Sequence, residues 1–273
     1  MSWQQYDLVF RLQSPLHSGW RKVGNLQQTR GYVTGKMLWA GLTARLTREA
    51  GLGADGQAYV RTGNAVTECF RFSYLYPALQ NGSGYETHYP WQDDFDYLFL
   101  DSYASTALHY PSQSAEEGLL HETEYIAPHT RTDQPVYLTG TVYAQTSPPP
   151  PLDRWLEVLD KLQFGGERGY GWGRVQLVGC DKKETIESER IRVEIAANDC
   201  ITAHLKAEKV TGVVGPIEPL IGWERNNQEN RKANWQLSKE AVICYTPGAT
   251  VTTASVFVIG ESGVLSRGGS PAS

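Results

Sequence analysis

The sequence predicts an α+β protein whose first 180 residues follow the order β-α-β-β-α-β. Apolar residues make up 40% of the 273 positions and charged residues 20%, which is enough apolar material for a packed core. Two segments carry apolar residues at helical spacing, and four have the alternation or the aromatic and β-branched residues typical of strands. The helical segments are 36–48 and 152–162, and the strand segments are 6–12, 69–76, 135–145 and 173–178.

The first strand and the first helix have the clearest patterns. Large apolar residues occupy every second position from Tyr6 to Leu12, and Ser14-Pro15 ends this strand. Residues 17–34 are polar and marked by glycine, so we expect a long loop there. From Lys36 to Arg48 leucine recurs every four residues, which predicts an amphipathic helix.

The middle of the chain contains two more strands separated by an unusual segment. Cys69 to Tyr76 and Pro135 to Gln145 read as strands. Between them, residues 77–128 are acidic and aromatic without a clear period. Because a structureless loop of this length is uncommon in a compact domain, we expect an insertion with its own small packing.

The second helix and the last strand of the pattern enclose a glycine-rich segment. Pro148 to Pro151 lead into the helical spacing of 152–162, and Gly165 ends the helix. The final strand runs from Gly173 to Val178. The complete order is that of a ferredoxin-like fold, in which an antiparallel sheet carries both helices on one face. A free sheet face of this kind is a common RNA platform.

We therefore expect a ferredoxin-like domain over 1–180, with the insertion at about 77–128 and a glycine-rich loop at 165–173. Residues 181–190 are charged and predict a linker. A smaller β-rich domain over 187–260, with a second ferredoxin-like module as one option, follows from strand patterns and a hairpin expected over 192–206. The small, polar residues 261–273 predict a flexible tail.

Charge is distributed unevenly along the chain. The net charge of −5 excludes a protein that coats nucleic acid by bulk charge. Residues 1–48 nevertheless hold seven Lys or Arg and one acid, whereas residues 86–124 hold nine acids and no Lys or Arg. One surface is expected to attract phosphate and another to repel it.

The sequence gives no sign of a cofactor, a metal or a membrane. The four cysteines are scattered, which argues against a zinc site and a disulfide framework and favours a reduced, cytoplasmic setting. We find no signal peptide pattern at the start and no run of about 18 apolar residues. The segment Gly31 to Met37 fails the phosphate-loop pattern, and dinucleotide, zinc-protease and serine-hydrolase motifs are absent.

The densest signal is the segment from Phe164 to Arg174, where five of the nine residues at 165–173 are glycine. Glycine brings backbone N–H groups close to a ligand, arginine pairs with phosphate, and aromatic faces stack on bases. This combination suits a single-stranded nucleic acid. The binding candidates in this segment are Gly165, Gly166, Arg168, Gly169, Tyr170, Gly171, Trp172 and Arg174.

A basic and amide-rich segment leads into the first helix, whose N-terminus favours anions. Its binding candidates are Arg21, Lys22, Asn25, Thr29, Arg30, Tyr32, Gly35 and Lys36. His129 and Arg131 are added as RNA-binding candidates. The acids Asp93, Asp94 and Asp96 have no basic partner nearby in sequence, and we interpret them as a solvated or subunit-facing surface.

These segments resemble the RAMP superfamily of CRISPR systems. Tyr32 to Leu42 resembles its Y-I-P-G-S-x-x-x-G-A-L element, with Thr34 in place of Pro and Lys36 in place of Ser. Ser14 to Gly19 resembles the segment before that element, and Phe164 to Arg174 the superfamily's glycine-rich loop. Phe70 to Pro77 and Gly248 to Val251 are also similar to stretches of a type III-D effector subunit.

The resemblance implies a non-catalytic subunit that caps the 5′ repeat-derived end of a guide RNA. Its implied partners are the guide RNA and other effector subunits, namely a large subunit and backbone RAMP subunits. Two alternatives stay open. One is a metal-independent endoribonuclease that processes precursor guide RNA with His17 or His129 as acid or base, and the other is a scaffold subunit that needs no RNA.

Overall fold

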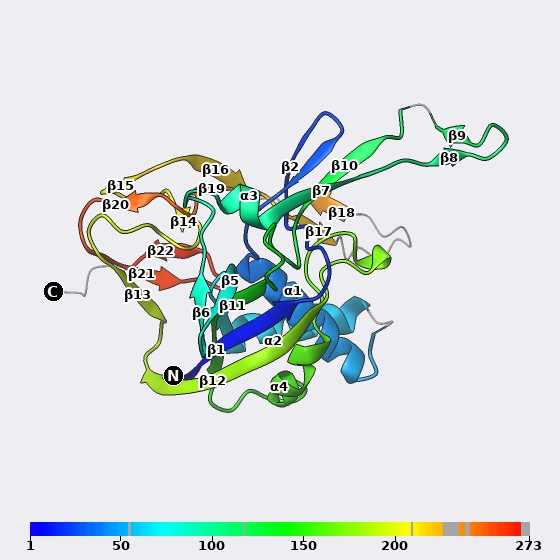
Figure 1. The fold of residues 1–273 in the computed structure, drawn as a ribbon. Helices are drawn as coiled ribbons and strands as arrows, with labels where there is room; N and C mark the ends of the chain where they lie inside the picture. Colours follow the sequence, from blue (N-terminus) through cyan, green and yellow to red (C-terminus); the bar gives the residue numbers. More distant parts are fainter. Residues whose placement is uncertain (54–55, 117, 209, 226–234, 238–240, 269–273) are drawn as a thin grey trace.

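The computed structural model describes residues 1–53, 56–116, 118–208, 210–225, 235–237 and 241–268. It confirms a mixed α+β fold dominated by curled antiparallel sheets (Figure 1). The helices are α1 (Gly35–Glu49), α2 (Gly56–Cys69), α3 (Phe95–Phe99) and α4 (Trp155–Val158), with 3₁₀ turns η1 (Leu152–Arg154), η2 (Leu159–Lys161) and η3 (Arg168–Tyr170).

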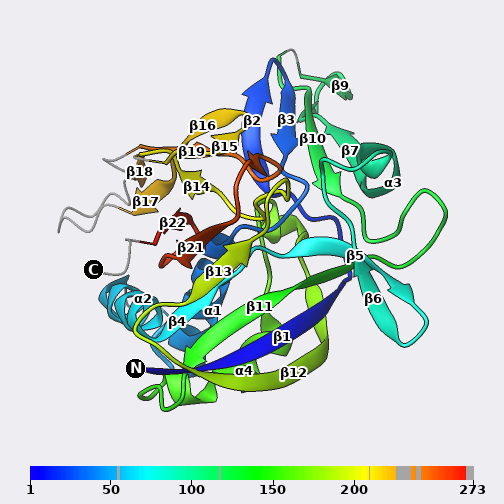
Figure 2. The same cartoon turned by 90° about the vertical axis from the view of Figure 1, so that its left-hand side faces the viewer.

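The largest sheet of the N-terminal part has the strand order β12-β1-β11-β5-β6, with β4 also paired to β11. Its neighbouring strands are antiparallel. Figure 2 shows α1 behind the strands of this sheet and α2 to the left of them, beside β4. The strands are β1 (Ser2–Leu12), β4 (Phe70–Phe72), β5 (Tyr76–Asn81), β6 (Gly84–Thr87), β11 (Tyr137–Gln145) and β12 (Val175–Glu187).

The first core lies between this sheet and the helices. Leu8 and Phe10 of β1 and the stripe residues Leu38 and Leu42 of α1 are 0–2% exposed and belong to one apolar cluster. Trp155 of α4 packs edge-on against Phe70 of β4, with ring centroids 5.4 Å apart. The periodicity that predicted the first strand and the first helix is thus the periodicity of burial.

Helix α2 was not predicted from the sequence. Its buried face contributes Val66 and Cys69 to the first core, but its other buried positions, Ala58, Thr62 and Gly63, are small or polar, so the apolar stripe is weak. A side chain on Gly63 would meet Trp39 of α1 at 2.8 Å. The small residues therefore allow α2 to pack closely on α1, which is a tertiary reason that local hydrophobicity does not report.

A second sheet, of order β2-β3-β10-β7, stands beside the first. Its strands are β2 (Gly19–Val23), β3 (Leu26–Thr29), β7 (Leu100–Ser105) and β10 (His121–Ile126). The expected long loop at 17–34 thus contains a hairpin, turned at Gly24 with φ of +60°. The predicted insertion extends β7 and β10 into a projecting arm, residues 100–126, which ends in the short strands β8 (Leu108–His109) and β9 (Ser114–Ala115) (Figure 1).

The C-terminal part contains a six-stranded sheet of order β13-β21-β22-β14-β19-β16. Its strands are β13 (Arg192–Ile195), β14 (Leu205–Lys206), β16 (Ile217–Leu220), β19 (Val242–Tyr245), β21 (Ser255–Ile259) and β22 (Leu265–Arg267). Two further pairs are β15 (Val213–Val214) with β20 (Thr250–Val251), and β17 (Trp223–Arg225) with β18 (Trp235–Leu237).

Three local expectations differ from this arrangement. The charged residues expected as a linker continue β12 to Glu187, because they pair with the start of β1. The hairpin expected over 192–206 does not form, since β13 pairs with β21 instead. The expected tail contributes β22, whose Leu265 is buried, while 269–273 lie outside the described residues.

The two parts share a second apolar cluster. Trp3, Tyr32, Tyr74 and Tyr76 from the first part pack there with apolar residues of the C-terminal sheet. Tyr76 also donates its hydroxyl to the carbonyl oxygen of Thr202 at 2.7 Å. The C-terminal part is therefore docked onto the first through an aromatic contact surface.

Candidate nucleic-acid interface

The glycine-rich loop is fastened to the segment that follows β1. The Gly166 N–H donates to the carbonyl oxygen of His17 at 2.9 Å, and the Gly173 N–H donates to that of Pro15 at 2.7 Å. Gly165 and Gly173 have φ of +76° and +73°, and a Cβ on either would overlap a backbone carbonyl group. These glycines permit the close approach of two backbones, which any side chain would prevent.

The expectation that the loop's backbone amides cradle a ligand is wrong for most of them. Besides Gly166 and Gly173, the N–H groups of Tyr170, Gly171 and Trp172 donate to carbonyl oxygens of the loop itself. The reason is the 3₁₀ turn η3, which closes the loop and uses these donors. Five of the nine loop amides are therefore already used as donors, and the exposed side chains are the larger part of what the loop offers to a ligand.

Those side chains do point outward. Tyr170 is 84% exposed, and Arg168 and Arg174 are exposed. A Cβ on Gly169 would meet nothing within 4 Å. Trp172 is half-buried, and its ring packs edge-on against Tyr125 of β10 with the centroids 5.1 Å apart.

Two helices extend the loop's surface with alternating cations and aromatic rings. The Lys36 Nζ lies 4.2 Å from the ring centroid of Trp39, and Trp39 packs edge-on against Tyr59 of α2 at 6.3 Å. Burial raises the pKa of Tyr59, while the positive charge of Arg168 acts to lower it, so Arg168 lies within electrostatic reach of α2. We call Lys36, Trp39, Tyr59 and Arg168 the cation–aromatic row.

Arg131, Tyr125 and Trp172 form a second set of cationic and aromatic groups at the glycine-rich loop. Burial and the charge of Asp101 raise the pKa of Tyr125, while the charge of Arg131 acts to lower it. Arg131 also forms an ion pair with Asp101 at 3.3 Å. Arg131 therefore acts electrostatically on Tyr125, whose ring packs on Trp172 of the glycine-rich loop. His129 is exposed, and its described contact is a backbone β-bridge to Pro135.

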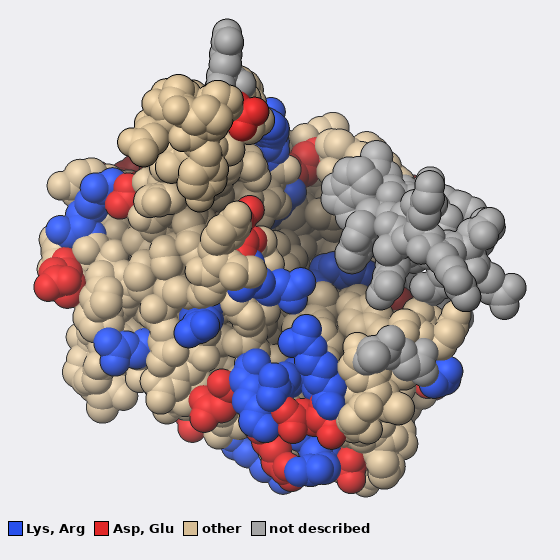
Figure 3. All heavy atoms as spheres, turned by 90° about the vertical axis from the view of Figure 1, so that its right-hand side faces the viewer, with Lys and Arg blue, Asp and Glu red and all other residues tan. Residues whose placement is uncertain are grey.

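Figure 3 shows this side of the molecule. A hollow lies beneath the arm, and Lys and Arg side chains gather along its lower border. Cationic grooves with aromatic platforms hold single-stranded nucleic acids, because every base offers a face for stacking and every phosphate a charge. Trp39 and Tyr59 were missed as candidates, since the sequence showed Trp39 only as part of a helix and did not predict α2.

The basic segment before α1 divides into exposed and internal residues. Arg21, Lys22 and Asn25 are exposed on the β2–β3 hairpin, and the Arg21 guanidinium lies 4.1 Å from the ring centroid of Trp20. Thr29 is buried, where its hydroxyl accepts the Ser18 N–H at 2.8 Å. Thr29 is therefore a structural residue in the free chain and not an exposed contact.

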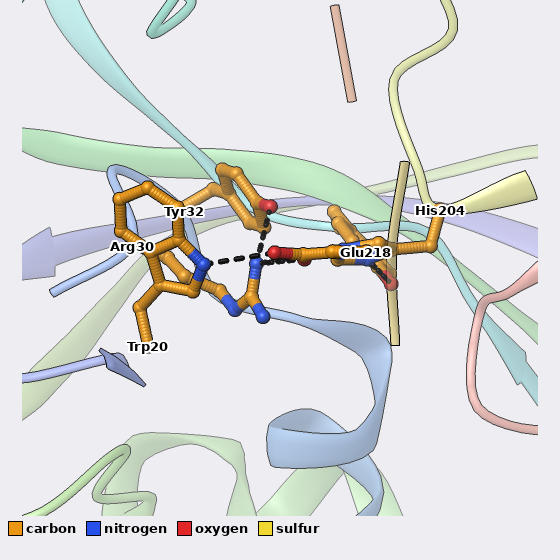
Figure 4. A network of polar contacts seen from close by, with 6 residues as sticks. Trp20, Arg30, Tyr32, His204 and Glu218 are labelled. Atoms are coloured by element: carbon orange, nitrogen blue, oxygen red, sulfur yellow. Dashed lines mark hydrogen bonds and ion pairs between the residues drawn. The ribbon is translucent and has the colours of Figure 1, made fainter. Parts of the chain in front are cut away.

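Arg30 and Tyr32, two further candidates, belong to an internal polar network (Figure 4). Arg30 forms an ion pair with Glu218 of β16 at 2.5 Å and donates to the hydroxyl of Tyr32 at 3.2 Å. Burial raises the pKa of Tyr32 to about 12. The charge of Arg30 is thus used to join the two parts of the molecule, and it is not available at the surface.

Glu218 is the centre of this network. It also accepts hydrogen bonds from Trp20 Nε1 at 2.8 Å and from His204 Nε2 at 2.6 Å. Burial alone would raise the pKa of Glu218, but these donors and the charge of Arg30 lower it from 4.5 to about 2. The carboxylate is therefore held ionised.

The protonation of His204 follows from its two neighbours. A carboxylate only accepts, so Nε2 carries the proton, and Nδ1 accepts from the Tyr74 hydroxyl at 2.7 Å. Burial lowers the pKa of His204, as does the charge of Arg30, while Glu218 acts in the opposite direction. The imidazole is accordingly neutral and fully enclosed.

The N-terminus of α1 is covered, contrary to the expectation that it would meet an anion. Thr34 and Gly35 are buried, and a Cβ on Gly35 would lie 2.5 Å from the carbonyl oxygen of Ser262. The turn before β22 occupies the space in front of the helix. Unlike Thr34 and Gly35, Lys36 is exposed, and it forms one end of the cation–aromatic row.

Among the described residues no group of His, Cys, Asp or Glu is arranged to hold a metal ion. Within the same residues, no helix combines the length and the hydropathy that a membrane span needs.

Comparison with known proteins gives a match in fold. No family model matches the sequence, and no curated protein matches it. A chain in a cryo-EM structure of the type III-B Cmr-beta complex bound to cognate target RNA aligns with 13% identity and a TM-score of 0.42. That alignment covers 67% of this protein and 61% of the other chain, less than two thirds of its length.

A chain in a second structure of Cmr-beta, bound to cognate target RNA and AMPPnP, aligns over 90% of this protein and 85% of its own length. Its TM-score is 0.50 at 12% sequence identity. The protein therefore has a fold similar to that of a chain found in this complex.

Replacing Gly173 by Ala should destabilise the protein, because the new Cβ would overlap the carbonyl group of Phe164 at a φ of +73°. We expect a loss of about 2 kcal/mol or more in the free energy of unfolding, measured by urea denaturation. Gly169→Ala is the matched control, because its Cβ would meet no atom within 4 Å and its φ is not left-handed. Equal losses in the two variants would contradict the anchoring role of the loop.

The largely enclosed carboxylate of Glu218 predicts how the free energy of unfolding depends on pH. A lowered pKa means that Glu218 stabilises the fold fully above pH 4.5 and loses this effect as the pH falls toward 2. His204 also lowers the stability as the pH falls. Its pKa is lower in the folded protein than in the unfolded chain, so the unfolded chain takes up the proton first. Glu218→Gln should cost about 3 kcal/mol at pH 7 and flatten the profile of unfolding free energy between pH 4.5 and 2. Parallel profiles for the two proteins would exclude this role.

Proposed function

We propose that the protein is a non-catalytic, RNA-binding subunit of a type III CRISPR effector complex, and that it holds the 5′ repeat-derived end of the guide RNA. The observation behind this proposal is the set of cations and aromatic rings on and beside the glycine-rich loop. It consists of Lys36, Trp39, Tyr59, Arg168, Tyr170, Trp172, Tyr125, Arg131 and Arg174.

The chemistry of this surface suits a flexible single strand better than a duplex. Aromatic rings can stack only on bases whose faces are accessible, and separated cations can follow a phosphate backbone that bends. The exposed Arg21 and Lys22 on the β2–β3 hairpin would continue the phosphate contacts toward the arm. Because the protein's net charge is −5, this local arrangement rather than bulk attraction would direct the strand.

The fold supports the same assignment. The likeness to a Cmr-beta chain is compatible with a place in a related assembly. The order β12-β1-β11, followed by β4 and β5, is also the antiparallel arrangement expected when a β-α-β-β-α-β chain folds as a ferredoxin-like module. We propose that this module positions the glycine-rich loop between α4 and β12.

The arm is proposed as the contact to a neighbouring protein subunit. Its large apolar side chains are exposed, which is typical of a surface that binds a partner. These side chains are Tyr103, Leu108, Tyr110, Leu119 and Leu120. A two-stranded hairpin is also only marginally stable in water by itself, so a partner would stabilise the arm. The absence of Lys and Arg from the sequence between 86 and 124 disfavours RNA and favours a protein surface that is apolar and rimmed by basic residues.

RNA binding can be tested with single-stranded RNA of about ten nucleotides, a length within the range of such sites, carrying the 5′ sequence recovered from the native assembly. Tyr170→Ala should weaken binding about tenfold, the effect of one lost stacking contact. Arg168→Ala should weaken it and reduce the slope of log Kd against log salt by about 0.7. Fluorescence anisotropy measures both.

Arg190→Ala is the matched control for Arg168→Ala. Arg190 is exposed in the turn between β12 and β13, so its removal changes the net charge equally. If the two arginine variants weaken RNA binding equally, the interaction depends on net charge and not on Arg168 in particular. Equal affinity of the wild type for a 3′ segment of the same guide would exclude recognition of the 5′ end.

Removing the tip of the arm, residues 106–120, tests the protein contact separately. We expect the shortened chain to fold and to bind RNA as the wild type does, because the tip lies beyond the β7–β10 pairing that runs to Ser105 and His121. Copurification with coexpressed effector subunits should be lost. Normal assembly of the shortened chain would rule out the arm as the docking element.

A further inference from the structure

His17 lies beneath the glycine-rich loop with one ring nitrogen fixed by the fold. Its Nδ1 is 2.7 Å from the carbonyl oxygen of Glu124, and its own carbonyl oxygen accepts the Gly166 N–H. A backbone carbonyl can only accept a hydrogen bond, so Nδ1 must carry the proton. In the neutral ring Nε2 is then an acceptor with its lone pair free to receive a donor.

Two glycines leave Nε2 uncovered. A Cβ on Gly19 would lie 3.4 Å from Nε2, and a Cβ on Gly166 would lie 3.1 Å from the adjacent Cδ2. Within the described part of the chain, Nε2 has no hydrogen-bond partner. The fully buried side-chain atoms there that lack a partner are Thr43 Oγ1 and Arg45 Nε, and Nε2 is not one of them. Nε2 is therefore not completely enclosed, although the residue as a whole is only 7% exposed.

This nitrogen lies next to segments that carry the proposed RNA surface. Gly166 stands two residues before Arg168, which ends the cation–aromatic row. Glu124, which holds the ring, directly precedes Tyr125, the residue that packs on Trp172. We therefore infer that a strand in contact with both Arg168 and Trp172 would pass close to Gly166 and the His17 ring beside it.

The chemistry of Nε2 restricts what it can receive from such a strand. Phosphate oxygens only accept, so they offer it nothing while the ring is neutral. Base edges can donate, but the flanking aromatic rings hold bases by their faces. The ribose 2′-hydroxyl donates, occurs in every ribonucleotide whatever its base, and is missing from DNA.

We propose that Nε2 of His17 accepts a hydrogen bond from a ribose 2′-hydroxyl and so makes this surface select RNA over DNA. The proposal rests on the proposed function, since it assumes that a single strand crosses the glycine-rich loop. It adds a specificity-determining residue that neither charge nor stacking supplies.

The test compares binding of RNA and DNA of one sequence, and of that RNA with single 2′-fluoro substitutions, which remove the hydroxyl donor. The wild type should bind the RNA about three- to tenfold more tightly than the DNA, the effect of one hydrogen bond. A 2′-fluoro group at one position should reproduce most of that loss. Fluorescence anisotropy with the full chain gives each Kd.

Two variants remove the acceptor in different ways. His17→Asn keeps an amide N–H near the place of Nδ1, so the bond to Glu124 is retained while Nε2 is lost. Gly19→Ala leaves His17 intact and places a methyl group against Nε2, at a position where φ is not left-handed and the contact is ordinary. Both should bind DNA as the wild type does and lose the preference for RNA.

The outcomes separate this proposal from the function on which it rests. A wild-type preference that survives in both variants, or a wild type that binds RNA and DNA equally, overturns the role of His17 and leaves RNA binding intact. Failure of the wild type to bind either strand contradicts the proposed function itself. Cleavage of the RNA that disappears in His17→Asn overturns the recognition role and assigns His17 to proton transfer.

Discussion

The proposed binding surface depends on one close approach between two backbones. The glycine-rich loop lies directly on the segment that follows β1, with Gly166 bonded to His17 and Gly173 bonded to Pro15. This contact uses two of the loop's amide donors, the 3₁₀ turn η3 uses three more, and Arg168 and Tyr170 are exposed to solvent. The loop therefore supports exposed side chains next to the segment after β1.

The second constraint is the buried carboxylate of Glu218. Its bonds to Arg30, His204 and Trp20 join β16 and β14 to the segment around β2 and β3. A buried charge of this kind is costly unless all its partners are present, so the network favours one relative placement of the two parts. The same placement brings Ser262 over the N-terminus of α1 and closes it to ligands.

The surface around the loop is assembled from segments far apart in the chain. Trp39 and Tyr59 come from two helices, Tyr125 from the base of the arm, and Arg168 from the loop. Cations and aromatic rings together provide charge and stacking. The acidic arm continues from β7 and β10, and β10 carries Tyr125, so under the proposed function a strand and a protein partner would meet the molecule on neighbouring surfaces.

The sequence by itself determined the elements whose burial follows a simple period, such as β1, α1 and β11, and it located the glycine-rich loop, because close backbone contacts require glycine. Tertiary structure decided what pattern cannot report. Thr62 and Gly63 occupy the buried face of α2, where their small size suits a close neighbour and leaves only a weak apolar stripe. Arg30 is charged like Arg168, yet a carboxylate 188 positions away withdraws it from the surface, since the partner of a charge is set by the fold and not by its neighbours in sequence.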